Sequence, residues 1–303
     1  MVMGRITFII LWASLSVTRS YSQDHNWWAQ NVDWDGVTHW SEYIQYGTAF
    51  MGPNALPVPE LKDALLPGQH SIGFTTAGHF MPGDQTTNLK LTATWIPASK
   101  ISIDLSYIPF EWYQTSHEVK TKRKVFHTFY DSKKASGDLI ITSNYQVLER
   151  KNTAIVLRWA FRLPTSSMQG AARYTNTPGY FAALSFSQVL QETINNPLKI
   201  HWMAGFYAWQ TNQDEQFQND AFLAGLGLSK QFRKLQFASS LRGYSGYLEI
   251  GDSPWVVDTV TTYQLKSTEL SFSLLHGLHD YPFTSLEVGV RFFFRAPNLS
   301  SEP

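Results

Sequence analysis

The sequence contains few groups suited to covalent or metal chemistry. It has no cysteine among its 303 residues, which excludes disulfide scaffolds, thiolate metal sites, a cysteine nucleophile and lipidation of an N-terminal cysteine. His276, His279 and Asp280 are metal-ligand types close together, but no further ligand motif lies nearby, and a solvated loop explains them. Serines and histidines are scattered, without a Gly-x-Ser-x-Gly motif. We therefore expect no catalytic residue, no metal and no cofactor.

Ionisable side chains recur instead at alternate positions of apolar segments. Arg158 and Arg162 are four residues apart, as are Glu287 and Arg291, so each pair shares one face of an extended strand. Such groups bind by charge and hydrogen bonding, which suits contacts with ions or polar solutes. The candidate site residues of this kind are Lys90, Asp104, Arg158, Arg162, Lys199, His201, Arg242, Asp258, Glu287 and Arg291.

The segments that carry these residues have a period of two. In residues 101–107, Ile, Ile, Leu and Tyr alternate with Ser, Asp and Ser, which is typical of a half-buried strand. Most such segments have about 10 residues, the length that a tilted strand needs to cross a bilayer. We predict twelve strands, at about 69–79, 87–96, 100–110, 139–149, 154–163, 180–190, 198–209, 220–229, 235–245, 255–265, 268–276 and 284–294.

One face of each predicted strand is apolar and the other carries the charges. An arginine facing hydrocarbon at the bilayer midplane costs about 2–4 kcal/mol, and a one-residue slip would expose both arginines of the strand 154–163 to lipid. The pattern therefore predicts a polar interior enclosed by a sheet without edges. The predicted fold is all-β, a closed up-and-down antiparallel transmembrane β-barrel of about twelve strands.

The predicted connections alternate between long and short. Long ones after the odd-numbered strands and short ones after the even-numbered strands are typical of a barrel with short periplasmic turns and longer outer loops. The long set is 80–86, 111–138, 164–179, 210–219, 246–254 and 277–283, and the short set is 97–99, 150–153, 191–197, 230–234 and 266–267.

Composition agrees with this class. Lys plus Arg and Asp plus Glu are both 24, so no charge excess favours a nucleic-acid partner. Charged residues are only 16% and aromatic residues 15%, while a mean hydropathy of −0.22 excludes a bundle of membrane helices. Aromatic residues near strand ends predict girdles at the membrane interfaces, formed by Trp95, Trp112, Tyr180, Trp209, Tyr244, Trp255 and Tyr263.

Residues 1–22 have the features of a secretory signal peptide. Arg5 precedes an apolar run, 6–17, and Ser20 and Ser22 supply the small residues of a cleavage site. The alternative, an N-terminal membrane anchor, is disfavoured because the run is shorter than the ~20 residues that span a bilayer. The predicted organisation is a signal peptide at 1–22, an N-terminal segment at 23–67, a barrel at 68–294 and a tail at 295–303.

The N-terminal segment, 23–67, does not alternate. Trp34, Val37, Trp40 and Ile44 follow helical spacing and predict a short amphipathic helix over about 34–46. A proline-rich stretch, 51–59, is extended and cannot be a central strand. Two placements stay open, at the periplasmic mouth of the barrel or inside the lumen as a plug, and the fold that we predict has the segment on the periplasmic side.

The dyad repeat, the alternating connections and the last strand, 288–294 (VGVRFFF), resemble a Gram-negative outer-membrane β-barrel. The resemblance covers residues 69–294 and concerns architecture, without a single family. It implies an outer-membrane location and recognition by the barrel-insertion machinery through the terminal aromatic residue, although nine residues follow Phe294. The basic loop 111–138 suggests contact with lipopolysaccharide among the outer-membrane lipids; the oligomeric state is not specified.

Three functional classes follow from this architecture. The leading prediction is a channel or binding barrel for small polar solutes, whose lumen is mildly basic because six Lys or Arg face three Asp or Glu. The first alternative is a non-conducting structural or adhesion barrel that works through loops 111–138 and 164–179. The second is a lipid-modifying barrel enzyme, which we do not expect because no close Ser–His pair lies on a lipid-facing strand. A secreted β-sandwich has the weakest support.

Overall fold

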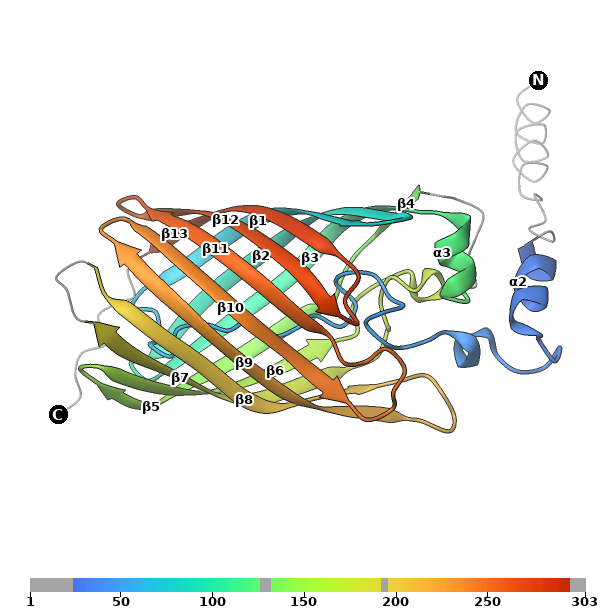
Figure 1. Ribbon diagram of the computed structural model, residues 1–303, viewed down its shortest axis with the longest axis horizontal. Helices are drawn as coiled ribbons and strands as arrows, with labels where there is room; N and C mark the ends of the chain where they lie inside the picture. The colour runs from blue at the N-terminus through green and yellow to red at the C-terminus, as the bar shows by residue number, and fades with distance from the viewer. Residues whose placement is uncertain (1–23, 126–131, 192–195, 295–303) are drawn as a thin grey trace, which may run out of the picture.

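The computed structural model describes residues 24–125, 132–191 and 196–294, which form one antiparallel sheet closed on itself (Figure 1). The predicted signal peptide, 1–22, and the predicted tail, 295–303, lie outside the described residues. Within the described ranges, no helix is long and apolar enough to cross a membrane. The helical elements are α2 (Asp24–Val32), η1 (Trp40–Tyr43), α3 (His117–Lys122) and η2 (Gln169–Ala171).

The prediction of a closed barrel with twelve wall strands is confirmed. The first and last strands pair antiparallel, from His70 opposite Phe294 to Phe80 opposite Thr284, so the wall has no free edge. The wall strands are β1 (His70–Met81), β2 (Asp84–Ala98), β3 (Ile101–Thr115), β5 (Leu139–Arg150), β6 (Thr153–Leu163), β7 (Gly179–Gln191), β8 (Leu198–Gln210), β9 (Gln218–Phe232), β10 (Leu235–Gly246), β11 (Trp255–Gln264), β12 (Thr268–His279) and β13 (Thr284–Phe294).

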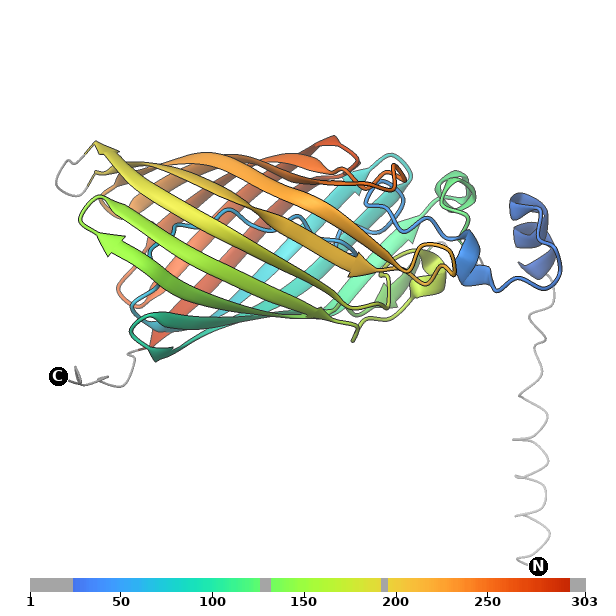
Figure 2. The ribbon, with the colours of Figure 1, turned by 90° about the horizontal axis from the view of Figure 1, so that it is seen from below.

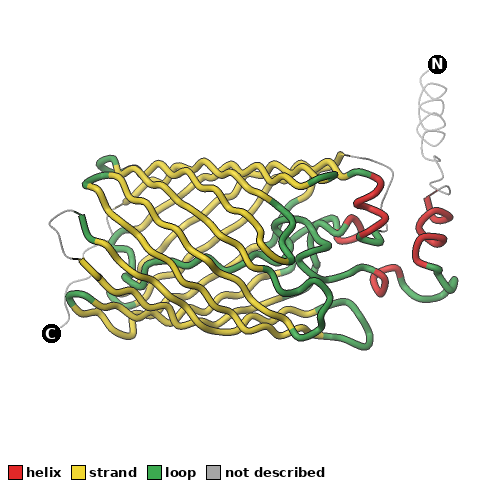
Figure 3. Tube along the Cα trace, viewed as in Figure 1, coloured by secondary structure: helices red, strands yellow, loops and turns green. Residues whose placement is uncertain are grey.

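One additional strand, β4 (Ser132–Ala135), was not predicted. It pairs with the end of β3, from Glu111 to Gln114, whereas β5 pairs with the beginning of β3, from Ile101 to Ser106. The strand therefore prolongs the wall at one mouth and takes no part in closing the barrel. Figure 3 shows the continuous wall of strands, with the helices gathered at one end.

The two mouths differ in their connections. One, the short-turn mouth, carries the connections 99–100, 151–152, 192–197, 233–234 and 265–267, and the other, the long-loop mouth, carries 116–138, 164–178, 211–217 and 247–254. The prediction of a long connection at 80–86 is wrong, because β1 and β2 extend until only Pro82 and Gly83 join them. Gly83, with a φ of +80°, allows this tight turn. The connection predicted at 277–283 shortens to 280–283, because β12 extends to His279.

Large apolar side chains cover the outer face of the barrel. They alternate along each strand with residues that point inward, as the predicted register requires. This band suits a hydrocarbon environment. In water, the barrel would expose an apolar surface far larger than the apolar patches of soluble proteins. Its members include Ile72, Phe74, Leu105, Leu157, Trp159, Phe161, Trp202, Phe206, Leu226, Leu228, Leu270, Phe272, Leu274 and Val288.

Two of the predicted interfacial girdle residues lie elsewhere. Trp209 is 1% exposed and Tyr244 is fully buried, and both belong to an apolar cluster inside the barrel. Their parity on β8 and β10 directs them inward, together with Tyr207. Position near a strand end suggested the girdle, but the face of the strand decides the environment. Trp95, Trp112 and Tyr263 are exposed, as a girdle requires.

The helix predicted over 34–46 is wrong. The structure has α2 earlier, and between α2 and η1 the chain turns at Asp35 and Gly36. The Asp35 carboxylate accepts hydrogen bonds from the backbone N–H groups of Val37 and Thr38, at 2.9 and 2.8 Å, which competes with helical bonding. Gly36, with a φ of +84°, completes the turn, and Val37 is 88% exposed rather than packed.

Residues 44–66, hereafter the lumen segment, run inside the barrel. The segment enters from the long-loop mouth and reaches β1 at the short-turn mouth, as the blue chain in Figure 2 shows. Ile44, Tyr46, Met51 and Leu56 are all fully buried. Of the two placements, the structure therefore shows residues 44–66 in the lumen, while α2 and η1 lie beyond the long-loop mouth (Figure 1). The side of the membrane that this mouth faces stays a prediction.

The register predicts how charge on the outer face affects stability. Leu226 lies near the middle of β9 and is exposed, so Leu226→Arg places a cation in hydrocarbon. We expect the free energy of unfolding to fall by about 2–4 kcal/mol, measured by denaturant titration in lipid vesicles. Leu190→Arg, near the end of β7, is the matched control and should cost at most about 1 kcal/mol. Equal losses would contradict the assignment of the band.

Candidate functional site

The half of the lumen near the short-turn mouth contains ion pairs between the wall and the lumen segment. The Lys90 ammonium lies 3.4 Å from Glu287 on the wall and 3.7 Å from Glu60 on the segment. The Lys199 ammonium lies 2.5 Å from the Asp63 carboxylate. These side chains keep substantial solvent exposure, up to 57% for Glu60. This half of the lumen is therefore a polar, water-accessible chamber.

A second set of contacts surrounds Asp104 on β3. Its carboxylate lies 3.2 Å from the Lys62 ammonium of the lumen segment. It also accepts hydrogen bonds from Thr94 at 2.8 Å and from Asn144 at 3.2 Å. Residues of the wall strands β2, β3 and β5 thus together bind Lys62 of the segment, through the carboxylate of Asp104.

Two arginines of the wall bind the backbone of the lumen segment. Arg158 donates to the carbonyl of Glu60 at 2.5 Å, and Arg242 donates to the carbonyls of Val58 and of the proline that follows it. Both arginines are almost fully buried, and Arg242 also lies 3.4 Å from Asp258. An extended segment leaves its carbonyls unpaired, so these donors replace the partners that a neighbouring strand would supply.

Side chains of β5 and β7 complete this pairing farther along. Gln146 donates to the carbonyl of Ala64 at 2.9 Å and accepts from the backbone N–H of Leu66 at 3.0 Å. Ser187 accepts from the backbone N–H of Ala64 at 2.8 Å. Ser187 is in turn 2.7 Å from a ring nitrogen of His201, which fixes its orientation.

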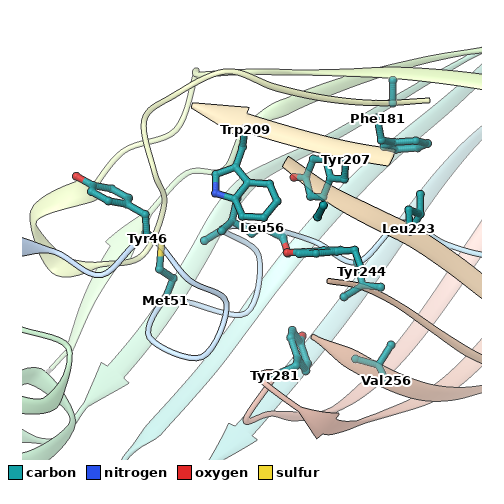
Figure 4. Packing of buried hydrophobic residues seen from close by; sticks show 14 of the residues in the cluster. Tyr46, Met51, Leu56, Phe181, Tyr207, Trp209, Leu223, Tyr244, Val256 and Tyr281 are labelled. Carbon is teal, nitrogen blue, oxygen red and sulfur yellow. The ribbon is translucent and has the colours of Figure 1, made fainter. Parts of the chain in front are cut away.

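The lumen near the long-loop mouth contains a buried apolar cluster, which wall and lumen segment form together. Met51 and Leu56 of the lumen segment pack among Tyr207, Trp209 and Tyr244 of the wall (Figure 4). The Tyr244 hydroxyl donates to the carbonyl of Leu56 at 3.0 Å, which satisfies both groups inside this cluster. The polar interior predicted from alternation is therefore not uniform in this half. Inward residues of β8 and β9 in this cluster, such as Tyr207 and Leu223, are aromatic or aliphatic, whereas Asp84, Asn88 and Glu111 on β2 and β3 are polar.

A buried charge cluster holds two loops over the long-loop mouth. Arg173, from the loop 164–178, lies 2.7 Å from Asp84 and 3.0 Å from Glu111. Arg123, from the loop 116–138, lies 2.6 Å from the same Asp84 oxygen. The Tyr174 hydroxyl donates to Glu111 at 2.7 Å, and burial, followed by this carboxylate, raises the pKa of Tyr174 well above its ordinary value. The phenol therefore stays a neutral donor at any physiological pH.

This cluster was not predicted from the sequence. Asp84 and Glu111 lie where β2 and β3 extend beyond the predicted strands, and both point inward. Arg123 and Arg173 belong to connections that were treated only as outer loops. The usable signal was the alternation Asp84, Thr86, Asn88, which continues the inward face of β2 by two more positions.

The remaining predicted residues also have partners. Arg162 donates to Asp138 at 2.6 Å and to Thr175 at 2.7 Å, so it braces two loops rather than the chamber. Arg291 lies 3.3 Å from Glu269 near the short-turn mouth. The ten predicted residues are thus divided among the chamber, the loop braces and the rim, and their contact with a solute stays a prediction.

The excess of positive charge predicted for the interior disappears when these partners are counted. The sequence sets six Lys or Arg against three Asp or Glu. The structure adds Lys62 to the cations, and Glu60, Asp63, Asp138 and Glu269 to the carboxylates, which makes seven of each. Two of the added carboxylates, Glu60 and Asp63, belong to the lumen segment, so the segment contributes to the balance among these paired groups. The net charge of the whole lumen stays a prediction.

Two histidines form serine contacts inside the barrel. His201 contacts Ser187 and Ser229, and His79 contacts Ser285, each at 2.7 Å. These pairs are buried, and Ser187 is also occupied by the lumen segment. They are braces of the wall rather than an exposed nucleophile with its base. Among the residues that the structure describes, no group of three His, Asp or Glu could hold a metal ion.

Comparisons with known proteins give the fold. No family model matches the sequence, and no curated protein matches it. A crystal structure of the COG4313 outer membrane channel from Pseudomonas putida F1 aligns over 78% of this chain and 100% of that chain, with a TM-score of 0.58 and 11% identity. The KdgM porin (73% and 99%, TM-score 0.49, 10% identity) and the NanC porin (73% and 98%, 0.45, 12%) are more distant.

These likenesses concern architecture alone, because the identities are so low. Together with the closed wall, the likeness to the COG4313 channel gives this chain the fold of an outer-membrane-type β-barrel, without a single identified family. The particular features of this chain are the lumen segment and the charge cluster over its long-loop mouth.

The charge cluster predicts a large effect of one arginine. Arg173→Met removes the shared partner of two buried carboxylates, so we expect the free energy of unfolding to fall by about 3–5 kcal/mol. The double variant Arg173→Met with Glu111→Gln should lose less free energy of unfolding than the sum of the two single variants, because it no longer leaves the Glu111 carboxylate without its arginine. Denaturant unfolding in vesicles measures both variants. A loss below about 1 kcal/mol for Arg173→Met would mean that the pair behaves as a surface ion pair.

Val37 lies beyond the long-loop mouth, so the orientation of the barrel predicts which side of the membrane this residue faces. Short turns are periplasmic in outer-membrane barrels, so the long-loop mouth faces outward. Val37→Cys, the only thiol in the chain, should react with a membrane-impermeant reagent on intact cells. Asn152→Cys, in a short turn, should react only after the outer membrane is permeabilised. The reverse pattern would overturn the orientation.

Proposed function

We propose that this protein is an outer-membrane channel for small polar solutes that the lumen segment closes in the described conformation. Residues 1–22 would direct its export, and the apolar band would place it in the outer membrane. The single observation that carries the proposal is the water-accessible chamber, whose charged side chains come from both wall and segment. A purely structural barrel has no need of solvated ion pairs between its wall and a segment inside its lumen.

The closing element lies at the other half of the lumen. A solute leaving the chamber toward the long-loop mouth meets the cluster around Leu56, Trp209 and Tyr244, where polar groups would lose their water. Passage therefore requires the lumen segment to move. The salt bridges of the segment can break into water at modest cost, because they are partly exposed.

The balanced charge of the filled chamber changes the expected selectivity. We do not propose the anion preference that the wall residues alone suggested, because Glu60 and Asp63 offset it while the segment is in place. Solute size and hydrogen bonding then govern passage. Contacts with lipopolysaccharide and with the insertion machinery remain proposals that follow from the architecture.

Conductance measurements on a cross-linked segment test the channel. Ala64→Cys with Ser187→Cys joins the segment to β7 at a point where backbone and side chain are 2.8 Å apart. In planar bilayers we expect the oxidised pair to lose the openings that the reduced pair shows. Ser239→Cys with Thr259→Cys, on the outer face of neighbouring wall strands, is the matched control and should conduct in both states.

A second pair of variants tests the channel in the case that the wild-type barrel opens too rarely to be recorded. Leu56→Asp places a carboxylate in the apolar cluster and should increase the open fraction at least about tenfold, since burying that charge costs several kcal/mol. Leu65→Asp, on the same segment but exposed, is its control. If neither wild type nor Leu56→Asp conducts, the channel is disproved and a non-conducting barrel is the better description.

A further inference from the structure

The long-loop mouth contains a cavity that no part of the channel proposal uses. Its volume is about 670 Å³, within the range of small-molecule sites. Three separate stretches of chain form its walls: residues 37–42 just before the lumen segment, the loop 164–178 and the loop 211–217. Because these stretches meet only when the chain is threaded through the barrel, the cavity belongs to the assembled state.

Internal hydrogen bonds hold these walls together. Gln213 donates to the carbonyls of Glu42 and Ile44, both at 3.2 Å, and the backbone N–H of Asp214 donates to the Glu42 carboxylate at 3.0 Å. Gln169 donates to the Tyr46 hydroxyl at 2.8 Å. The cavity is therefore a built feature that joins both loops to the beginning of the lumen segment.

One wall is held in an unfavourable backbone conformation. Met168, Ala172 and Asn176 of the loop 164–178 have φ values of +68°, +50° and +52°, a region that non-glycine residues rarely occupy. Gly52 donates from its backbone N–H to the Ala172 carbonyl at 2.8 Å, and a side chain at position 52 would collide with the loop. Such strain persists only where surrounding contacts impose it, and it is concentrated at ligand-binding sites.

The lining defines the ligand chemistry. Gln169, Asn176 and Asn212 supply amides that both donate and accept, and Thr38 and Ser41 supply hydroxyls, a set that matches a molecule bearing several hydroxyl groups. Glu42 and Asp214 add two carboxylates and His39 adds one imidazole, while the lining residues include no Lys or Arg, so carboxylates predominate. Anions are therefore repelled, and an amino group is favoured over a neutral one.

We propose that this cavity is an outward-facing binding site for a small polyhydroxylated molecule without negative charge, of the sugar or amino-sugar class. This site does not depend on conductance. Since its walls include the chain leading into the lumen segment, occupancy also stabilises the plugged state, by the differential affinity of the ligand for the two states. Only that second consequence rests on the proposed channel.

Three probes that differ chiefly in charge test the site: glucosamine, glucose and glucuronate. The readout is the rate at which a neutral methanethiosulfonate reagent modifies Val37→Cys, whose side chain lines the cavity in a chain with no other thiol. We expect saturable protection in about the millimolar range, as suits a ligand of roughly twelve non-hydrogen atoms. Protection should be strongest for glucosamine, weaker for glucose and weakest for glucuronate, and Phe217→Cys, exposed outside the cavity, should show none.

Charge variants decide whether the cavity itself sets this order. Glu42→Gln should weaken glucosamine protection about two- to fivefold and reduce its advantage over glucose. Glu215→Gln removes the same charge from the same loop as Asp214 but lies outside the lining, and should leave protection unchanged. Absence of saturable protection by glucosamine and glucose, stronger protection by glucuronate, or equal effects of the two variants would each overturn the site.

Conductance distinguishes the site from its link to the channel. If occupancy favours the plugged state, glucosamine should lower the open fraction of Leu56→Asp over the concentrations that protect Val37→Cys. Protection without any change in conductance would retain the site and overturn the link. A silent channel with full protection would disprove the proposed channel and leave the site standing.

Discussion

The interior of this barrel is governed by the need to pair every buried cation and peptide group. Arginines facing inward escape the hydrocarbon, but they still lie in a region where an unpaired charge is costly. The wall does not supply enough partners, so Arg158 and Arg242 bind carbonyls of the lumen segment. In return, Gln146 and Ser187 pair the peptide groups of the segment. Wall and segment thus satisfy polar groups of each other inside the barrel.

The same constraint explains the asymmetry of the lumen. Ion pairs such as Lys199 with Asp63 lie where water still reaches them, which keeps the cost of burying charge low. Toward the long-loop mouth the partners become aromatic, and the fully buried charges there, Asp84 and Arg173, have several hydrogen bonds each. A movement of the lumen segment is therefore easiest at the chamber and hardest at the cluster around Leu56, and in the proposed channel that cluster would be the barrier to passage.

Sequence periodicity predicted the wall well and the interior poorly, for a physical reason. Alternation is imposed by the bilayer at every strand, so the twelve wall strands and their lipid-facing residues such as Leu157 and Phe272 could be identified. Trp209 and Tyr244 were misplaced because their position near a strand end was used, although they share the inward face of Lys199 on β8 and of Arg242 on β10. The partners of Arg158 are backbone carbonyls, which have no sequence signal at all.

The long-loop mouth adds a constraint that links distant parts of the chain. Arg123 and Arg173 share one oxygen of Asp84, so the two loops that carry them cannot leave independently without stranding that carboxylate or its remaining arginine. Asn54 of the lumen segment donates to Glu111 at 2.9 Å, within the same cluster. Withdrawal of the segment therefore weakens the bracing of both loops, and release of the strained loop 164–178 favours the same change. Segment and loops thus act as a single closing element, because the same buried carboxylates hold all three in place.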